Sequence, residues 1–287
     1  MTTALFTSDL HGSKKKYEFL FNKILTIKPG AVFLGGDLMG FAAKARSAAI
    51  PTGEDFLYDY LAMNLQMIRD ELKNEYPEIF VILGNDAPKS HEAALLDISI
   101  TGLLTYVNEI KANFQTYTVI GYSYVPPTPF LNKEWEKYDV SRFVDVGCVS
   151  PEEGFRSFPV SADQLRFFTI KRDLENLFAG VDLSRTICLF HSSPYQTRLD
   201  RAELDGVMID HAPLDVHVGS IAIKEFILSR SPYLTLHGHI HESTRMTGSW
   251  KEIIGDTISF QGATERDENG IILFDLDDPK NAKMLKD

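Results

Sequence analysis

One stretch near the N-terminus indicates the fold class: Ala4-Leu5-Phe6-Thr7-Ser8-Asp9-Leu10-His11. Residues 4–7 are small, apolar or β-branched, which predicts a short buried strand. The polar residues that follow predict a loop carrying Asp9 and His11. In an extended backbone, residues two apart point the same way, so both side chains could reach one ligand.

The same unit, an apolar strand that runs into a polar or glycine loop, recurs along the chain. Strands are predicted over residues 31–34, 79–83, 186–190 and 233–236, and helices over residues 14–27 and 54–74. In open α/β sheets, ligand sites gather outside the carboxyl ends of the strands. The polar residues that follow these four strands are Asp37, Asn85, Asp86, His191, His239 and His241.

The remaining segments complete one predicted domain, residues 1–287. Residues 117–124 alternate like a strand, and residues of about 126–160 show no clear period, so we interpret them as an insertion. The C-terminal region is typical of a hairpin, with strands over residues 257–261 and 271–275 and Asn269-Gly270 in the turn region.

Composition narrows the class of substrate. The net charge is -11 with a pI near 5.2, and the densest basic run, Lys14 to Lys16, is expected on a solvated helix face. A protein that grips nucleic acid usually shows a basic face, so a small substrate is expected instead. Two distant cysteines, Cys148 and Cys188, indicate neither a disulfide framework nor a cysteine zinc site.

The location of the protein is a further expectation from the sequence. We find no targeting signal, and the long uncharged run over residues 112–132 is interrupted by prolines and amides, unlike a membrane span. A cytoplasmic protein that does not enter the membrane is therefore expected. The sequence contains no indication of the oligomeric state.

The candidate ligands combine carboxylate, amide oxygen and imidazole, without thiolate. This donor set suits Mn²⁺, Fe, Co²⁺ or Zn²⁺, and we expect two divalent ions, with manganese as the first choice. Two such ions ~3.5–4 Å apart form a clamp for displacement at phosphorus. Gly35 and Gly36 before Asp37 leave room for that carboxylate to approach both ions.

This ordered set resembles the calcineurin-like metallophosphoesterase superfamily, whose pattern is D-x-H, G-D, G-N-H, a lone His and G-H-x-H. The resemblance implies an α/β fold, a four-layered αββα sandwich of two mixed sheets flanked by helices. It also implies how the ligands divide between the ions. One ion would take Asp9, His11, Asp37 and His241, and the other Asp37, Asn85, His191 and His239.

The implied activity is metal-dependent hydrolysis of a small phosphorylated substrate, with a phosphodiester favoured over a monoester. A hydroxide bridging the two ions would attack phosphorus, while Asp37 shares both ions and Asn85 helps to orient a phosphoryl oxygen. Two alternatives stay open. One is a nuclease acting on DNA or RNA, and the other is a non-catalytic binding scaffold of the same fold.

One residue departs from the family pattern, because Asp86 stands where the family has a histidine near the leaving group. An unperturbed aspartate has a pKa near ~3.9, so Asp86 would be a poor general acid at neutral pH. Either the leaving group needs no proton, or another histidine supplies it. His217 is the candidate, because it precedes a predicted helix start at Gly219-Ser220; the alternative is a surface loop histidine.

Three aromatic residues and one further histidine have two interpretations each. Tyr122, Tyr124 and Trp135 lie near the proline-rich segment, where they could line a substrate pocket, although aromatic residues more often belong to the core. His237 precedes the G-H-x-H motif and is expected to be a core histidine or one that supports a ligand.

Overall fold

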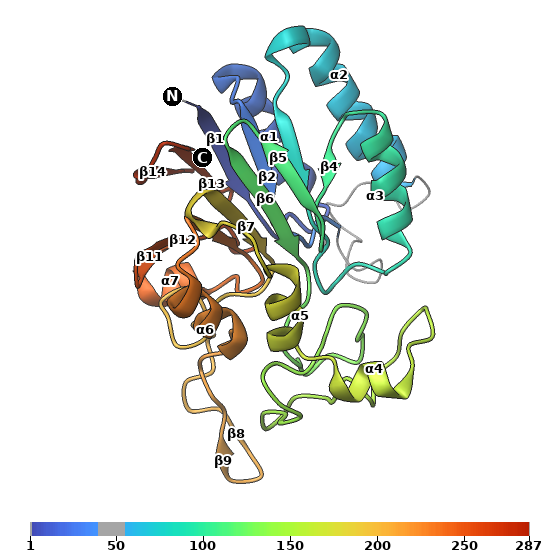
Figure 1. Cartoon of the computed structure of the whole chain (residues 1–287), viewed down its shortest axis with the longest axis vertical. Helices are drawn as coiled ribbons and strands as arrows, with labels where there is room; N and C mark the ends of the chain where they lie inside the picture. Colours follow the sequence, from blue (N-terminus) through green and yellow to red (C-terminus); the bar gives the residue numbers. More distant parts are fainter. Residues whose placement is uncertain (1, 40–54, 287) are drawn as a thin grey trace.

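The computed structural model describes residues 2–39 and 55–286, and two six-stranded sheets form its centre (Figure 1). The first sheet has the order β14 (Asp278–Leu285), β13 (Ile271–Asp275), β1 (Thr3–Thr7), β2 (Ala31–Leu34), β3 (Glu78–Val81), β4 (Thr105–Tyr106). The second has the order β11 (Lys251–Ile254), β12 (Thr257–Gln261), β10 (Leu234–His237), β7 (Thr186–Phe190), β6 (Tyr117–Tyr122), β5 (Lys111–Phe114). Both sheets mix parallel and antiparallel pairs.

The two sheets pack face to face through one side of each strand. Successive residues of a strand point to opposite faces of its sheet. Phe6, Phe33 and Phe80 of the first sheet therefore meet Leu189 and Leu236 of the second in a buried apolar layer. Burial of these large side chains from water holds the two sheets together.

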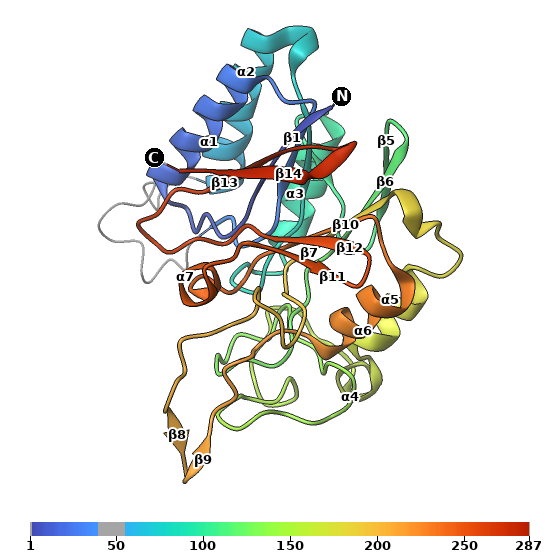
Figure 2. The ribbon, with the colours of Figure 1, turned by 90° about the vertical axis from the view of Figure 1, so that its left-hand side faces the viewer.

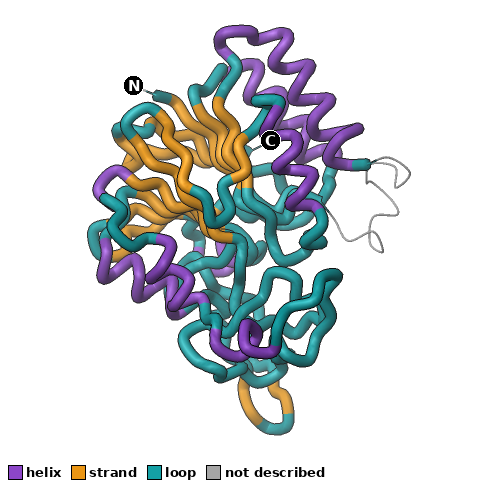
Figure 3. Tube along the Cα trace, turned by 45° about the vertical axis from the view of Figure 1, so that its right-hand side comes forward, coloured by secondary structure: helices purple, strands orange, loops and turns teal. Residues whose placement is uncertain are grey.

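Helices cover the outer face of each sheet. Residues of α1 (Lys14–Ile27), α2 (Met63–Leu72) and α3 (His91–Ile100) share a buried cluster with Val32 and Val81 of the first sheet. Residues of α5 (Ile170–Leu177) and α6 (Ile221–Arg230) share another with Cys188 and Phe190 of the second. Figures 2 and 3 show the strands between these two sets of helices. The predicted four-layered αββα fold is confirmed.

The helix predicted over residues 54–74 forms as three successive pieces, although Glu54 lies outside the described residues. A π-helix, η1 (Phe56–Ala62), precedes α2, and a 3-10 turn, η2 (Lys73–Glu75), ends it. Asp55 caps the start by accepting hydrogen bonds from the backbone of Leu57 and Tyr58. The other short elements are α4 (Ala162–Phe167), η3 (Leu183–Arg185), β8 (Met208–Ile209), β9 (Ala212–Pro213) and α7 (Ser243–Thr247).

The predicted C-terminal hairpin is wrong, because its two strands lie in different sheets. β12 pairs with β10 and β11 in the second sheet, whereas β13 pairs with β1 and β14 in the first. Residues 262–270 carry the chain from one sheet to the other. At Gly262 an added Cβ would lie 2.7 Å from the Phe6 ring, so glycine lets this crossing pass close to the core.

Residues 123–161 contain no helix or regular strand, only isolated bridges such as those of Val125 with Glu136 and Asn132 with Phe155. The segment is nevertheless held together internally by a fully buried ion pair, in which Lys133 Nζ lies 2.5 Å from Glu136 Oε2. That residues 126–160 are an insertion within one domain stays a prediction. No helix in the described part of the chain combines the length and apolar character needed to cross a bilayer.

Candidate metal centre

The parallel central strands bring five polar loops to one edge of the two sheets. β1, β2 and β3 are neighbours in the first sheet, and β7 and β10 are neighbours in the second. Backbone bonds join the first two loops directly, because Asp9 N donates to Gly36 O and His11 N donates to Asp37 O. The residues that follow the five strands are Asp9, His11, Asp37, Asn85, His191, His239 and His241.

Three of these residues, Asp9, His11 and His241, form the first donor group, and one ligand atom of each lies within 4.8 Å of the others. His11 Nε2 and His241 Nε2 are 2.9 Å apart, and the Asp9 Oδ1 atom lies 3.5 Å from His241 Nε2. Asp9 is fully buried, and its Oδ1 has no hydrogen-bond partner. A buried carboxylate oxygen of this kind is costly unless a cation meets it.

The second donor group consists of Asp37, His191 and His239, again within 4.8 Å. His191 Nε2 lies 3.0 Å from Asn85 Oδ1 and 3.4 Å from Asp37 Oδ2. The same Asp37 oxygen is 3.9 Å from His11 Nε2 in the first group. Asp37 therefore stands between the two groups, with its carboxylate within reach of both.

In two of the histidines, a hydrogen bond from Nδ1 leaves Nε2 as the ring nitrogen that can bind a metal. His191 Nδ1 donates to Gly35 O and His241 Nδ1 donates to Thr264 O, both at 2.8 Å. This fixes the tautomer and turns each Nε2 toward the site, as outer partners of metal-bound histidines do. The nitrogen and oxygen donors suit Mn²⁺, Fe, Co²⁺ or Zn²⁺. The residues present therefore fit two divalent ions.

Without metal, His191 binds its proton tightly. Burial disfavours the charged ring, but the carboxylates of Asp37 and Asp9 outweigh burial and raise the pKa of His191 to about 9. An ion that takes Nε2 at neutral pH therefore displaces a proton.

The backbone at the site is not extended, contrary to the sequence argument for Asp9 and His11. Their φ angles are 58° and 44°, and Asp37 and His239 have φ of 46° and 74°. Residues other than glycine rarely adopt this left-handed region, although Asp, Asn and His enter it more readily than most. Asp9 and His11 still reach the same donor group, but through a tight turn. Strained backbone of this kind is concentrated at functional sites.

Two glycines make room for the donor groups. An added Cβ at Gly84 would collide with Asp37 Oδ1 and lie 2.6 Å from His191 Nε2. At Gly238 an added Cβ would collide with Ser8 Oγ. Both positions therefore require glycine because the loops approach one another closely.

Lys16 supports the site, and its expected position on a solvated face is wrong. Its side chain is buried, and Nζ donates to the carbonyls of Asp9 and Thr264 at 3.2 and 3.3 Å. Burial lowers its pKa, although the nearby Asp9 carboxylate opposes this. Lys16 thus ties the loop after β1 to the loop after β12, where the Thr264 carbonyl also accepts from His241 Nδ1. Nothing in a run of three lysines signals that the third turns inward.

Asp86 also lies at the site, where it contacts two of the proposed ligands. Its Oδ2 lies 3.2 Å from His11 Nδ1, and its backbone N–H donates to Asp37 Oδ1 at 3.0 Å. Burial opposes protonation of His11, but the Asp86 carboxylate and Asp37 raise its pKa. Asp86 therefore holds the ring of His11 with Nε2 toward His241. No pattern in the sequence signals this contact.

His217 lies in another hydrogen-bonded network. Its Nδ1 donates to the buried carboxylate of Asp200 at 2.8 Å, and its ring packs at an edge against Tyr195. The same carboxylate accepts hydrogen bonds from the backbone of Gln196, Thr197 and Gly219. These contacts order the loop before α6. A role for His217 in protonating the leaving group stays a prediction.

His237 is the buried core histidine that the sequence predicts. Its Nδ1 donates to Ser192 O and its Nε2 accepts from the Thr235 hydroxyl, both at 2.8 Å. Burial lowers its pKa to about 4, although the Ser192 carbonyl opposes this. The neutral ring is therefore the form that the folded protein holds.

We expect His237 to make the metal-free protein sensitive to acid. Its pKa falls from about 6.5 unfolded to about 4 folded, so its stabilisation is complete above pH 6.5 and lost as the pH falls toward 4. The shift corresponds to about 3 kcal/mol. Urea unfolding at pH 7 and 4.5 should show a shallower pH dependence for His237→Gln. Exposed His211→Asn should behave like wild type, and an unchanged slope in His237→Gln would contradict the assignment.

Solved structures with TM-scores above 0.5 share this fold at low sequence identity. One crystal structure superposes with a TM-score of 0.62 at 17% identity, covering 99% of this chain and 98% of the other. The structure of TT1561 from Thermus thermophilus gives 0.57 at 16% identity, covering 99% and 98%. A dimetal phosphatase from Danio rerio gives 0.49 at 11% identity, covering 95% and 91%. No curated protein sequence matches.

The sequence itself matches a family model. The model described as calcineurin-like phosphoesterase covers residues 2–243, which include every loop of the two donor groups. The implied chemistry is metal-dependent hydrolysis, which the Asp and His groups fit. The chain therefore belongs to the calcineurin-like phosphoesterase family.

Proposed function

We propose that this protein hydrolyses a small-molecule phosphodiester. The reaction would use two divalent metal ions bound by the protein, with Mn²⁺ as the preferred metal. One ion would be held by Asp9, His11, Asp37 and His241, and the other by Asp37, Asn85, His191 and His239. The observation that carries the proposal is the position of Asp37, whose Oδ2 lies 3.4 Å from His191 Nε2 and 3.9 Å from His11 Nε2. One carboxylate can thus serve both donor groups.

When bound, the two ions would lower the pKa of a coordinated water and polarise the phosphoryl oxygens. The protein's own residues would position the metal ligands and the substrate. Gly35 O and Thr264 O fix the rings of His191 and His241 through Nδ1. Asn85 is proposed to orient a phosphoryl oxygen with its amide nitrogen, since its Oδ1 faces His191.

The preference for a diester rests on the charge near the site. A monoester carries up to two negative charges at neutral pH, whereas a diester carries one. The carboxylate of Asp86 lies 3.2 Å from a ring nitrogen of His11, itself a proposed ligand. Repulsion between this carboxylate and the substrate is therefore greater for the monoester. The acidic balance of the chain, -11, supports a small substrate over nucleic acid.

The test is hydrolysis of bis(p-nitrophenyl) phosphate beside p-nitrophenyl phosphate. Treatment with chelator should lower nitrophenolate release at least about 100-fold, and added Mn²⁺ should restore it, since no protein group replaces the ions. Nitrophenolate leaves without protonation, so Asp86 would not mask the activity. We expect faster release from the diester.

Three outcomes would contradict the proposal in whole or in part. Hydrolysis that survives complete metal removal, checked by elemental analysis, would exclude the metal-dependent reaction. Two ions bound with no turnover of either ester would support a binding role. Faster hydrolysis of the monoester would retain the metal reaction but overturn the diester preference.

A further inference from the structure

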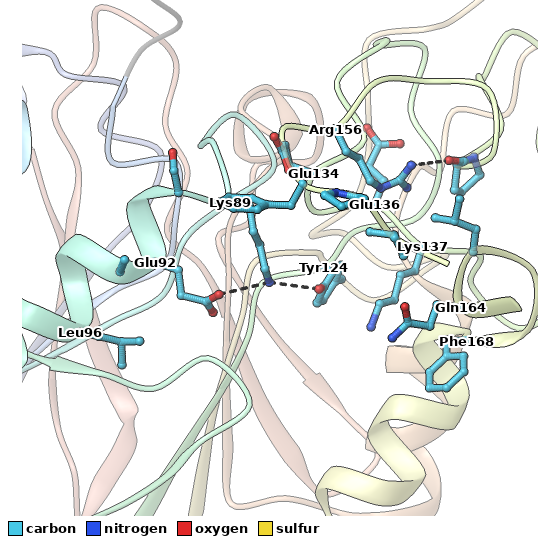
Figure 4. Close-up of a pocket in the computed structure, with 17 residues that line it drawn as sticks. Lys89, Glu92, Leu96, Tyr124, Glu134, Glu136, Lys137, Arg156, Gln164 and Phe168 are labelled. Carbon is cyan, nitrogen blue, oxygen red and sulfur yellow. Dashed lines mark hydrogen bonds and ion pairs between the residues drawn. The ribbon is translucent and has the colours of Figure 1, made fainter. Parts of the chain in front are cut away.

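A cavity of about 730 Å³ lies between the start of α3 and the segment that follows β6. One wall is formed by Lys89, Ser90, Glu92, Ala93 and Leu96, and residues 124–168 supply the rest. Figure 4 shows Tyr124 between these two sides, with Gln164 and Phe168 at the far end. The volume falls within the ~300–1,000 Å³ that small-molecule sites usually have.

Much of the lining is apolar and exposed. Four large apolar side chains of the cavity have exposed fractions between 38% and 52%: Leu96, Phe158, Val160 and Phe168. They are drawn from α3 and from residues 158–168, so two separate segments present apolar surface to one space. An apolar ligand would remove this surface from water, which is favourable in proportion to the area covered.

The charged groups of the cavity have polar partners within the protein, and Arg156 and Glu134 find theirs in the backbone of Pro151 and Ser157. Lys89 Nζ lies 3.5 Å from Glu92, 3.2 Å from the Tyr124 hydroxyl and 3.6 Å above the ring of Trp135. Lys137 Nζ bonds to Asp173 and lies 3.9 Å from the centre of the Tyr124 ring. Across the lining, three cations (Lys89, Lys137, Arg156) face three carboxylates (Glu92, Glu134, Glu136). This balance favours an uncharged ligand over an anion or a cation.

The segment that lines the cavity contacts a loop of the proposed metal centre. Lys89 follows Asn85 by four residues, so their backbones are at most about 14 Å apart. Asn132 Nδ2 donates to Asn85 O at 3.1 Å, and the indole N–H of Trp135 donates to Ala87 O at 3.0 Å. Asn132 and Trp135 are both buried. The segment that walls the cavity therefore also holds the loop that carries Asn85.

We propose that this cavity binds an uncharged, apolar organic group of the phosphodiester substrate, while the phosphate lies at the metal centre. This inference rests on the proposed function, because it assigns the group attached to that phosphate. The enzyme then selects diesters with one bulky apolar substituent. Tyr124 and Trp135, for which the sequence left both roles open, divide accordingly: Tyr124 lines the cavity and Trp135 is buried beneath Lys89.

The experiment compares methyl and hexyl p-nitrophenyl phosphate, which share one leaving group. Each buried methylene contributes roughly fourfold, so burial of only two predicts a hexyl-to-methyl ratio in kcat/KM above about 10. Ala93→Trp and Leu96→Trp, both on exposed positions of α3, should fill the cavity and lower this ratio toward 1. Ile100→Trp, on the same helix but outside the cavity and 85% exposed, should retain it.

A binding measurement separates this inference from the proposed function. 2-Naphthol, an uncharged aromatic probe, is titrated with metal-stripped wild-type protein and with each of the three tryptophan variants. Binding is followed by the fluorescence of the naphthol. Binding that Ala93→Trp abolishes, with no diester hydrolysed, would support the apolar site and reject the hydrolytic function. Equal hydrolysis of both diesters, with no naphthol bound, would overturn the inference and leave the function intact.

Discussion

Replacement of Asp37 by asparagine is expected to lower diester turnover at least about 100-fold, on the scale of losing one electrostatic contact at a reaction centre, and to reduce the bound metal below two ions. Asp37 is the carboxylate within reach of both donor groups. Asparagine has the same shape as aspartate and retains Oδ1. In the wild-type protein this atom accepts a hydrogen bond from the backbone N–H of Asp86 at 3.0 Å. The substitution therefore removes the charge and little else.

The fold should tolerate this change. Asp37 has φ of 46°, and asparagine is among the residues that enter this left-handed region most readily. Turnover, metal content and thermal midpoint should be measured together, with exposed Asp256→Asn as the matched control. A variant that retains two ions and wild-type turnover would show that Asp37 is not the shared ligand.

The strand ends could be predicted from sequence because the apolar run of the strand and the polar loop residues after it are both local features. A run such as Ala31–Leu34 is apolar throughout because it is covered on both faces, and the glycines and Asp37 follow at once. Parallel pairing then places the carboxyl ends of β1, β2 and β3 along one edge. The position of the candidate site follows from this pattern without knowledge of any distance.

The pairing of the last strands could not be predicted in the same way. The sequence pattern of residues 257–261 and 271–275 is the same for two arrangements. The two strands could pair with each other, or each could pair with strands of a different sheet, as they do in the structure. The nine residues between them are long enough for either arrangement. What decides is the burial of Phe260 and Phe274 in the layer between the sheets, which depends on the whole chain.

Contacts between loops that are distant in sequence could not be predicted from the sequence either. Lys16 is one of three consecutive lysines, and only the fold shows that its Nζ meets the carbonyls of Asp9 and Thr264. Asp86 and His11 are 75 residues apart in sequence, and neither residue signals the other. The backbone at Asp9 is left-handed rather than extended, because the surrounding loops impose a conformation that the residue itself disfavours.

Removal of the Asp86 carboxylate, by Asp86→Ala, is expected to weaken Mn²⁺ binding ~10–100-fold, the usual effect of losing the partner of a metal-bound histidine. Asp86 Oδ2 lies 3.2 Å from His11 Nδ1, so the variant frees the ring to turn its Nε2 away from His241. At saturating Mn²⁺ the nitrophenyl diester should still turn over within a few-fold of wild type, because nitrophenolate needs no proton from the enzyme.

A role in protonating the leaving group makes the opposite prediction. If Asp86 were the acid, Asp86→Ala would leave Mn²⁺ affinity unchanged and would slow a phenyl diester far more than its nitrophenyl counterpart, because phenolate is the poorer leaving group. Mn²⁺ titrations of both esters, with Asp256→Ala as the matched exposed control, separate the two roles. The hydrogen bond to His11 favours the first, since a carboxylate engaged with a ring nitrogen is an acceptor rather than a proton donor.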